Sequence, residues 1–172
     1  MPVIAVCIMI IWYIGHLANQ VKIREISNGN VEFRLNLLNI ITLWFGFISS
    51  IFLILLSIIN LKDNNTLHIL FSYGFFGCQL LVFILDTTLY FKINHHLNAT
   101  YYERERKTDY RPWVCLAFIA NIVIFYFLYL YKESPLLVNF SATQSVYIAS
   151  EYMLVFIGLS YASAYRTEIR IY

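Results

Sequence analysis

The sequence has few charged residues. Of its 172 residues only 13% are charged, while 60% are hydrophobic. Soluble domains of this size are about a quarter charged and about half apolar, so this chain has too few polar side chains to coat a water-soluble globule. The formal net charge of +2 is too small to indicate a nucleic-acid partner. The composition therefore predicts an integral membrane protein.

The sequence also lacks the common catalytic and metal-binding motifs. It has no Gly-rich phosphate loop, no G-x-S-x-G and no H-E-x-x-H. Three cysteines, each inside an apolar run, fit neither a disulfide framework nor a Cys/His metal site (Cys7, Cys78 and Cys115). The adjacent His95 and His96 would face different directions on a helix. We therefore expect no metal, no cofactor and no enzymatic activity.

Five apolar runs are present, at residues 3–18, 37–59, 67–91, 113–131 and 146–165. An α-helix needs about 20 apolar residues to cross a bilayer. Helices and closed barrels are the structures that lipid permits, and none of these runs alternates as a barrel strand does. The sequence thus predicts an all-α fold, a single domain over residues 1–172 that forms a transmembrane bundle of five helices. No cleavable signal peptide is expected, because no basic region precedes the first run.

The basic residues are distributed asymmetrically between the connections. Ten of the 12 Lys and Arg residues fall in the segments 19–36, 92–112 and 166–172, which share one side of the predicted membrane topology. By the positive-inside rule this side is cytosolic, so the N-terminus is predicted outside or in the lumen and the C-terminus in the cytosol. The sequon at Asn139 then lies outside and is a candidate for glycosylation, while the sequon at Asn98 is cytosolic.

The two predicted cytosolic loops are candidates for contacts with lipid headgroups or a protein partner. Their candidate residues are Lys22, Arg24, Arg34, Arg104, Arg106, Lys107 and Arg111. The first loop has two interpretations: alternating runs around Asn28-Gly29 favour a β-hairpin, or the second helix begins early, at Val31. The mixed charges of residues 101–111 favour a helix with side-chain pairs over a dedicated phosphoinositide site.

Polar residues inside the predicted spans are the default functional candidates. They are His68, Gln79, Asp86, Asn121 and Glu151. Asp86 is expected near the inner boundary and Glu151 near the outer one, about 14 Å apart in depth, which is too far for a shared-proton pair. His68 is expected at the same depth as Glu151. Glu151 could contribute to helix packing, contact a lipid or substrate, or act as a general acid or base. Asp86 is expected to serve packing or to reach water or Lys92.

Gln79 and Asn121 lie in the middle of their predicted spans. Interhelical hydrogen bonding is the simplest interpretation of both. Small residues at helical spacing, such as Gly74 and Gly77, indicate places where helices approach closely.

Several short segments, in order along residues 20–170, resemble the DRAM/SFK/FRAG family of multi-pass membrane proteins. They are Val31-Glu-Phe-Arg-Leu-Asn36, Gly46-Phe-Ile-Ser-Ser50, Ser72-Tyr-Gly74, Asp86-Thr-Thr-Leu-Tyr90 and Ala149-Ser-Glu-Tyr152. The family usually has a histidine at the position of Phe71, a glutamine at that of Asp86 and a tryptophan at that of Tyr152. Its members usually have six spans, so the five runs here indicate a divergent or shortened member.

The resemblance implies lipid handling or scaffolding at a membrane. Similar proteins include lysosomal modulators of autophagy, organisers of phosphoinositide kinase assemblies and a branch involved in GPI-anchor remodelling. We therefore expect a non-enzymatic subunit, bound to lipids and to a larger protein complex, in the plasma membrane or an endomembrane (ER, Golgi or lysosome). The alternatives are a lipid-remodelling enzyme that uses an outer-leaflet layer of His68 and Glu151, and an accessory subunit of a transporter or channel.

Overall fold

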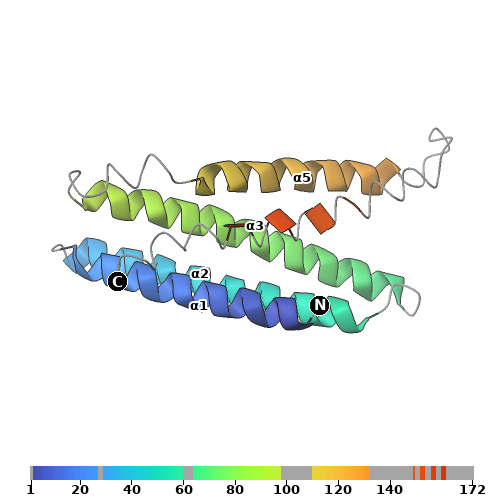
Figure 1. Cartoon of the computed structure of the whole chain (residues 1–172), viewed down its shortest axis with the longest axis horizontal. Helices are drawn as coiled ribbons and strands as arrows, with labels where there is room; N and C mark the ends of the chain where they lie inside the picture. The colour runs from blue at the N-terminus through green and yellow to red at the C-terminus, as the bar shows by residue number, and fades with distance from the viewer. Residues whose placement is uncertain are drawn as a thin grey trace.

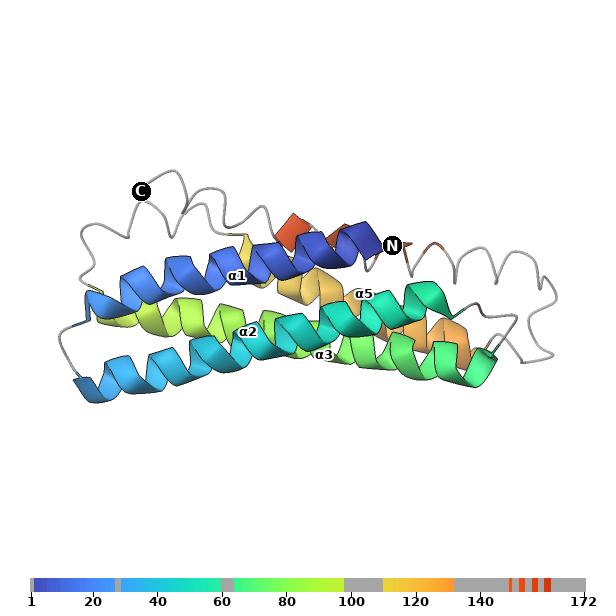
Figure 2. The ribbon, with the colours of Figure 1, turned by 90° about the horizontal axis from the view of Figure 1, so that it is seen from below.

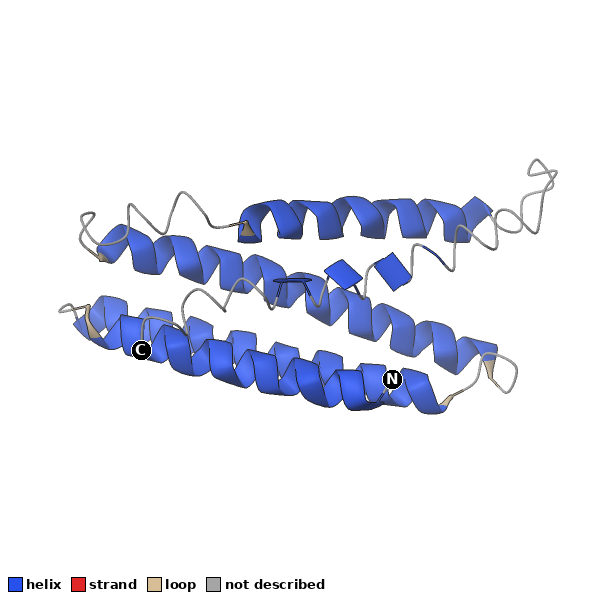
Figure 3. Cartoon of the chain, in the orientation of Figure 1, coloured by secondary structure: helices blue, strands red, loops and turns tan. Residues whose placement is uncertain are grey.

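The computed structural model describes residues 2–26, 29–59, 64–97 and 110–131, together with seven helical residues between 149 and 161. Four helices are complete: α1 (Pro2–Arg24), α2 (Gly29–Ile58), α3 (Asn65–His96) and α5 (Arg111–Tyr131). Over this described part every regular element is a helix (Figures 1 and 3). The prediction of an all-α bundle is confirmed.

The helices run back and forth along one long axis (Figure 1). α2 packs along both α1 and α3, and α5 lies along α3 on the side away from α1 and α2 (Figures 1 and 2). Consequently the end of α1, the start of α2, the end of α3 and the start of α5 all lie toward the same end of the bundle (Figure 1). We call this the basic end, because the Lys and Arg residues that the structure describes lie toward it: Lys22, Arg24, Arg34, Lys92 and Arg111.

The helices have the length and surface of membrane-spanning helices. α1, α2 and α3 are each long and apolar enough to cross a bilayer, and Arg111–Phe127 is a shorter apolar helix. Large apolar side chains face outward, among them Trp44 at 61% exposure and Phe127 at 53%. Such surfaces suit contact with lipid tails. The chain is therefore an integral membrane protein, while the fifth span and the orientation across the membrane stay predictions.

The helices extend beyond the predicted apolar runs. The prediction that residues 19–36 form a loop is therefore wrong. α1 continues to Arg24 and α2 begins at Gly29. The hairpin interpretation is therefore wrong, and the early helix start is right, two residues before Val31. The length of an apolar run matches the hydrocarbon thickness of the bilayer. A helix does not have to end there, because each added residue forms one more backbone hydrogen bond, so the helix continues into the polar boundary of the membrane.

Packing at the basic end stabilises these extensions. Ile23 and Ile26 follow the first apolar run and are buried against Leu35, Leu89, Ile93 and Leu97. A second, larger core lies nearer the middle of the bundle, where Trp12, Phe83, Phe118 and Tyr161 pack together. α3 contributes to both cores, so its apolar face holds the bundle along most of its length.

Glycine permits close approach of helices at two positions. A Cβ atom at Gly46 would lie 2.6 Å from Cγ of Trp12, and one at Gly74 would lie 2.9 Å from the ring of Phe52. At Gly77 a Cβ atom would meet nothing within 4 Å. Of the predicted Gly74/Gly77 pair, Gly74 therefore lies at a close contact and Gly77 does not.

Candidate functional site: a buried carboxylate at the basic end

Asp86 lies on the core-facing side of α3. Phe83, Leu89, Tyr90 and Ile93 recur at the helical intervals of three, four and seven residues and are all buried. Asp86 shares their face and is only 1% exposed. The helical period thus brings a carboxylate into the bundle, where an isolated negative charge would be strongly unfavourable.

Three side chains from other helical segments stabilise this carboxylate. The hydroxyl of Tyr161 donates a hydrogen bond to Asp86 Oδ2 at 2.9 Å, and Asn19 Nδ2 on α1 donates to Oδ1 at 3.4 Å. Arg111 Nη1, at the start of α5, lies 4.0 Å from Oδ2. One carboxylate therefore joins α1, α3, α5 and the helical segment that contains Tyr161.

Tyr161 is held in place on both its ring and its hydroxyl. Its ring stacks on Phe83 with 4.3 Å between centroids, and it lies 6.0 Å from the ring of Trp12. Its hydroxyl is also 3.0 Å from Thr87 Oγ1. Because Tyr161 donates its proton to Asp86, the Thr87 hydroxyl donates to Tyr161.

Arg111 is buried as deeply as its partner. It is 1% exposed, and its guanidinium carbon lies 4.7 Å from the centroid of the Tyr90 ring, a cation–π distance. Pro112 follows it and suits the first turn of α5, where the missing N–H makes no intrahelical bond. We call Asn19, Asp86, Thr87, Tyr90, Arg111 and Tyr161 the Asp86 network.

Two of the predicted headgroup or partner contacts lie inside the bundle. Arg111 is part of the Asp86 network, and Lys22 is 4% exposed, one turn beyond Asn19 on α1. Lys22 lies four residues after the run 3–18 and Arg111 two residues before the run 113–131, so both fall in predicted loops. The extension of α1 and the start of α5 at Arg111 bury them instead. Lys92, a predicted partner of Asp86, is exposed.

Of the other intramembrane candidates, Gln79 makes the interhelical hydrogen bond expected of it, at 2.9 Å from Ser49 on α2. His68 Nδ1 lies 2.9 Å from the carbonyl oxygen of Ile59. A carbonyl oxygen accepts only, so Nδ1 donates there and ties the beginning of α3 to the end of α2. Asn121 is half-buried on α5. Glu151, Arg104, Arg106, Lys107 and Asn139 lie outside the described residues.

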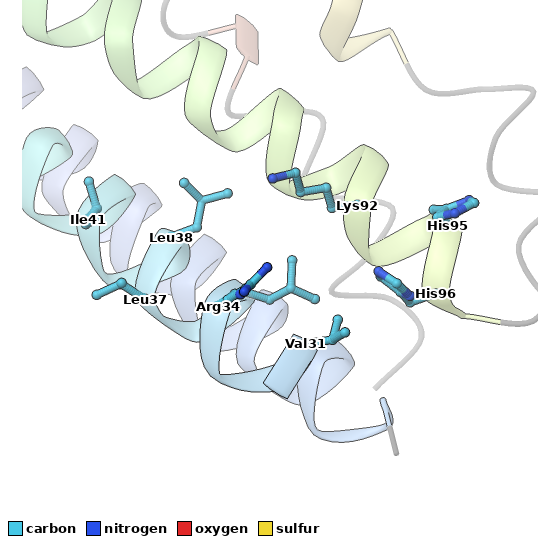
Figure 4. Close-up of a pocket in the computed structure, with 9 residues that line it drawn as sticks. Val31, Arg34, Leu37, Leu38, Ile41, Lys92, His95 and His96 are labelled. Atoms are coloured by element: carbon cyan, nitrogen blue, oxygen red, sulfur yellow. The ribbon is translucent and has the colours of Figure 1, made fainter. Parts of the chain in front are cut away.

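A groove at the basic end contains a second group of polar residues. It lies between the start of α2 and the end of α3, with a volume of about 530 Å³ (Figure 4). We call it the basic groove; its lining residues are Val31, Arg34, Leu35, Leu37, Leu38, Ile41, Lys92, His95 and His96. Of its polar residues, Arg34 alone was predicted from the sequence to contact a headgroup or a partner; Lys92, His95 and His96 were not. The short connection between α2 and α3 is a signal for the groove, because it makes the two helices antiparallel neighbours and so brings the start of α2 beside the end of α3.

These features define the chain first as a multi-pass helical membrane protein, whose buried polar side chains bond to one another between helices and whose apolar side chains face outward. It belongs to the family described as the Frag1/DRAM/Sfk1/Cwh43P N-terminal domain, whose model matches residues 1–170. The predicted family is thus confirmed over nearly the whole chain. No curated protein and no solved structure matched in direct comparison.

Proposed function

We propose that this protein is a non-enzymatic membrane subunit that organises lipids and anchors a larger lipid-handling assembly. The assembly would act in lipid transfer, phosphoinositide metabolism or autophagy-type membrane regulation, in line with the lipid handling or scaffolding that the family resemblance implies. The observation that carries the proposal is the Asp86 network, in which a buried carboxylate is engaged by three side chains from three other helical segments.

This arrangement favours packing over chemistry. A general acid or base needs access to a substrate proton, whereas Asp86 and Arg111 are each 1% exposed and face each other. His68, the described half of the alternative His68/Glu151 enzyme site, donates to a backbone carbonyl between two helices. A subunit of this kind acts through what it binds, at its apolar faces and at its basic end.

Affinity purification from the source membranes in mild detergent, followed by mass spectrometry, tests this proposal. We expect the same partner proteins, with bound lipids, in repeated preparations. A chain that is recovered alone, with no reproducible partner, would contradict the proposal. The control is a purification of an unrelated membrane protein of similar size from the same membranes.

A further inference from the structure

The basic groove combines charge and apolar surface in an order that matches a phospholipid. Arg34 precedes the apolar run of α2 by about one turn, and Lys92 directly follows the apolar run of α3. Leu37, Leu38 and Ile41 line the groove one to two turns deeper along α2. The charged groups thus lie at the expected membrane boundary, and the apolar wall lies on its hydrocarbon side.

The lining of the groove is positively charged. Arg34 and Lys92 are exposed, His95 and His96 lie beside them on α3, and none of the nine lining residues is acidic. Among the described residues, no carboxylate forms an ion pair with Arg34 or Lys92. Figure 4 shows the Arg34 side chain extending from α2 toward α3, where Lys92, His95 and His96 project from the last turns. An anion in the groove would therefore meet cations from both helices.

The floor of the groove is part of the folded core. Leu35 is 3% exposed and belongs to the core that joins α1, α2 and α3 at the basic end, and Val31 and Leu38 pack against that core. The groove is therefore preformed on packed helices. Its volume of about 530 Å³ lies within the range of about 300–1,000 Å³ typical of small-molecule sites.

We propose that the basic groove binds one anionic phospholipid, with its phosphate at Arg34 and Lys92 and an acyl chain along Leu37, Leu38 and Ile41. This inference rests on the proposed function and gives the lipid a site and a chemical class. Cytosolic leaflets are rich in anionic lipids, and basic pockets between transmembrane helices are suited to their headgroups. Arginine offers a planar fork of donors that matches a phosphate, and lysine adds a compact charge.

Native mass spectrometry of the purified full chain, with any proteins that accompany it, tests this site. The protein receives equal amounts of dioleoylphosphatidylserine and dioleoylphosphatidylcholine, and the lipid that stays bound is identified. We expect one phosphatidylserine per chain. Glycerophosphoserine, which has the phosphate but no acyl chains, should not displace it at the same concentration.

Charge-removing variants locate the headgroup. Arg34→Gln and Lys92→Gln should each weaken phosphatidylserine binding by about fivefold, the effect of about one basic residue near an anionic lipid. Arg24→Gln is the matched control: the sequence made Arg24 a candidate for headgroup contact, but it is exposed at the same end of the bundle and does not line the groove, so the proposed site excludes it. It removes the same charge and should leave binding unchanged.

A variant that fills the groove tests the acyl chain. Ile41→Trp places a bulky side chain on the apolar wall and keeps every charge, so it should reduce phosphatidylserine binding. Ile40→Trp is its control, since Ile40 is 42% exposed and lies next to Ile41 but outside the lining. Both lie on exposed positions of α2, and the thermal midpoints of both variants establish that the bundle remains folded.

Several results would overturn this proposal. Equal retention of the two lipids would mean that the lipid is attracted nonspecifically to the protein. Equal losses of phosphatidylserine binding in the Arg34→Gln and Arg24→Gln variants would mean the same. Displacement by glycerophosphoserine would mean a site for soluble phosphate esters. A dimer or a partner protein that dissociates in the Arg34→Gln variant would mean a protein interface. If partners still co-purify while phosphatidylserine selectivity is absent, the groove proposal fails and the proposed function stands.

Discussion

Asp86 is the one buried acidic residue among those that the structure describes. Its position on α3 would place a charge in a low-dielectric bundle, yet Tyr161, Asn19 and Arg111 surround it with two donors and a cation. The unfavourable free energy of burying the Asp86 carboxylate is offset only while these partners are present. The contribution of each residue to stability should therefore depend on the others.

Removing the carboxylate should destabilise the protein. In Asp86→Ala, Arg111 keeps its buried charge and loses its counter-ion, which costs about 3 kcal/mol in buried pairs. Thermal unfolding in detergent, followed by tryptophan fluorescence, should show a clearly lower midpoint. Glu25→Ala is the matched control, because Glu25 is exposed at the same end of the bundle. Equal midpoints for the two variants would contradict the structural role of Asp86.

The hydroxyl of Tyr161 should contribute less than the carboxylate. Tyr161→Phe keeps the ring that stacks on Phe83 and removes the oxygen that bonds to Asp86 and Thr87. We expect a loss of about 1 kcal/mol in the free energy of unfolding. Tyr152→Phe, at another described helical position that is 62% exposed, should cost little. A midpoint of Tyr161→Phe that equals the wild-type midpoint would show that these hydrogen bonds add no stability.

At the scale of elements, the contact between α1 and α2 depends on the absence of a side chain. Trp12 lies directly over Gly46, and its indole is also packed against Phe83 and Tyr161. The ring therefore has little room to retreat from a new methyl group. The same contact places Trp12 where it fills the core between α1, α2, α3 and Tyr161.

Gly46→Ala should push α1 away from α2 and cost about 1–3 kcal/mol, the usual effect of overpacking. Gly77→Ala is the control on α3, where a Cβ atom meets nothing within 4 Å. Replacing glycine by alanine inside a helix favours the helix by up to about 1 kcal/mol. We therefore expect opposite shifts of the unfolding midpoint in the two variants, and equal shifts would contradict the packing at Gly46.

The apolar runs predicted the helices but not their ends. Each run reports which residues suit hydrocarbon, so α1, α2 and α3 were predicted, whereas their polar extensions to Arg24, Gly29 and His96 depend on packing at the basic end. Asp86 could be predicted as a buried polar residue from its place in a run. Its partners could not, because Asn19, Arg111 and Tyr161 are far from it in sequence and meet only through the arrangement of the helices.

At the scale of the whole molecule, the asymmetry of basic residues predicts the orientation across the membrane. Expression in cells that glycosylate proteins should show a carbohydrate-dependent mobility shift, which Asn139→Gln removes and Asn98→Gln leaves unchanged. The reason is that only a sequon on the lumenal side meets the glycosylation machinery. A shift that depends on Asn98 would mean the opposite orientation.

The structure describes one helical bundle with a buried polar network, a basic groove and wide apolar faces. If such a molecule acts through binding, its natural form is a complex. Extraction of native membranes into polymer-bounded lipid discs, followed by measurement of the particle mass, tests this most directly. We expect particles whose protein mass clearly exceeds the 20.3 kDa of one chain. Particles that contain one chain and lipid alone would contradict it.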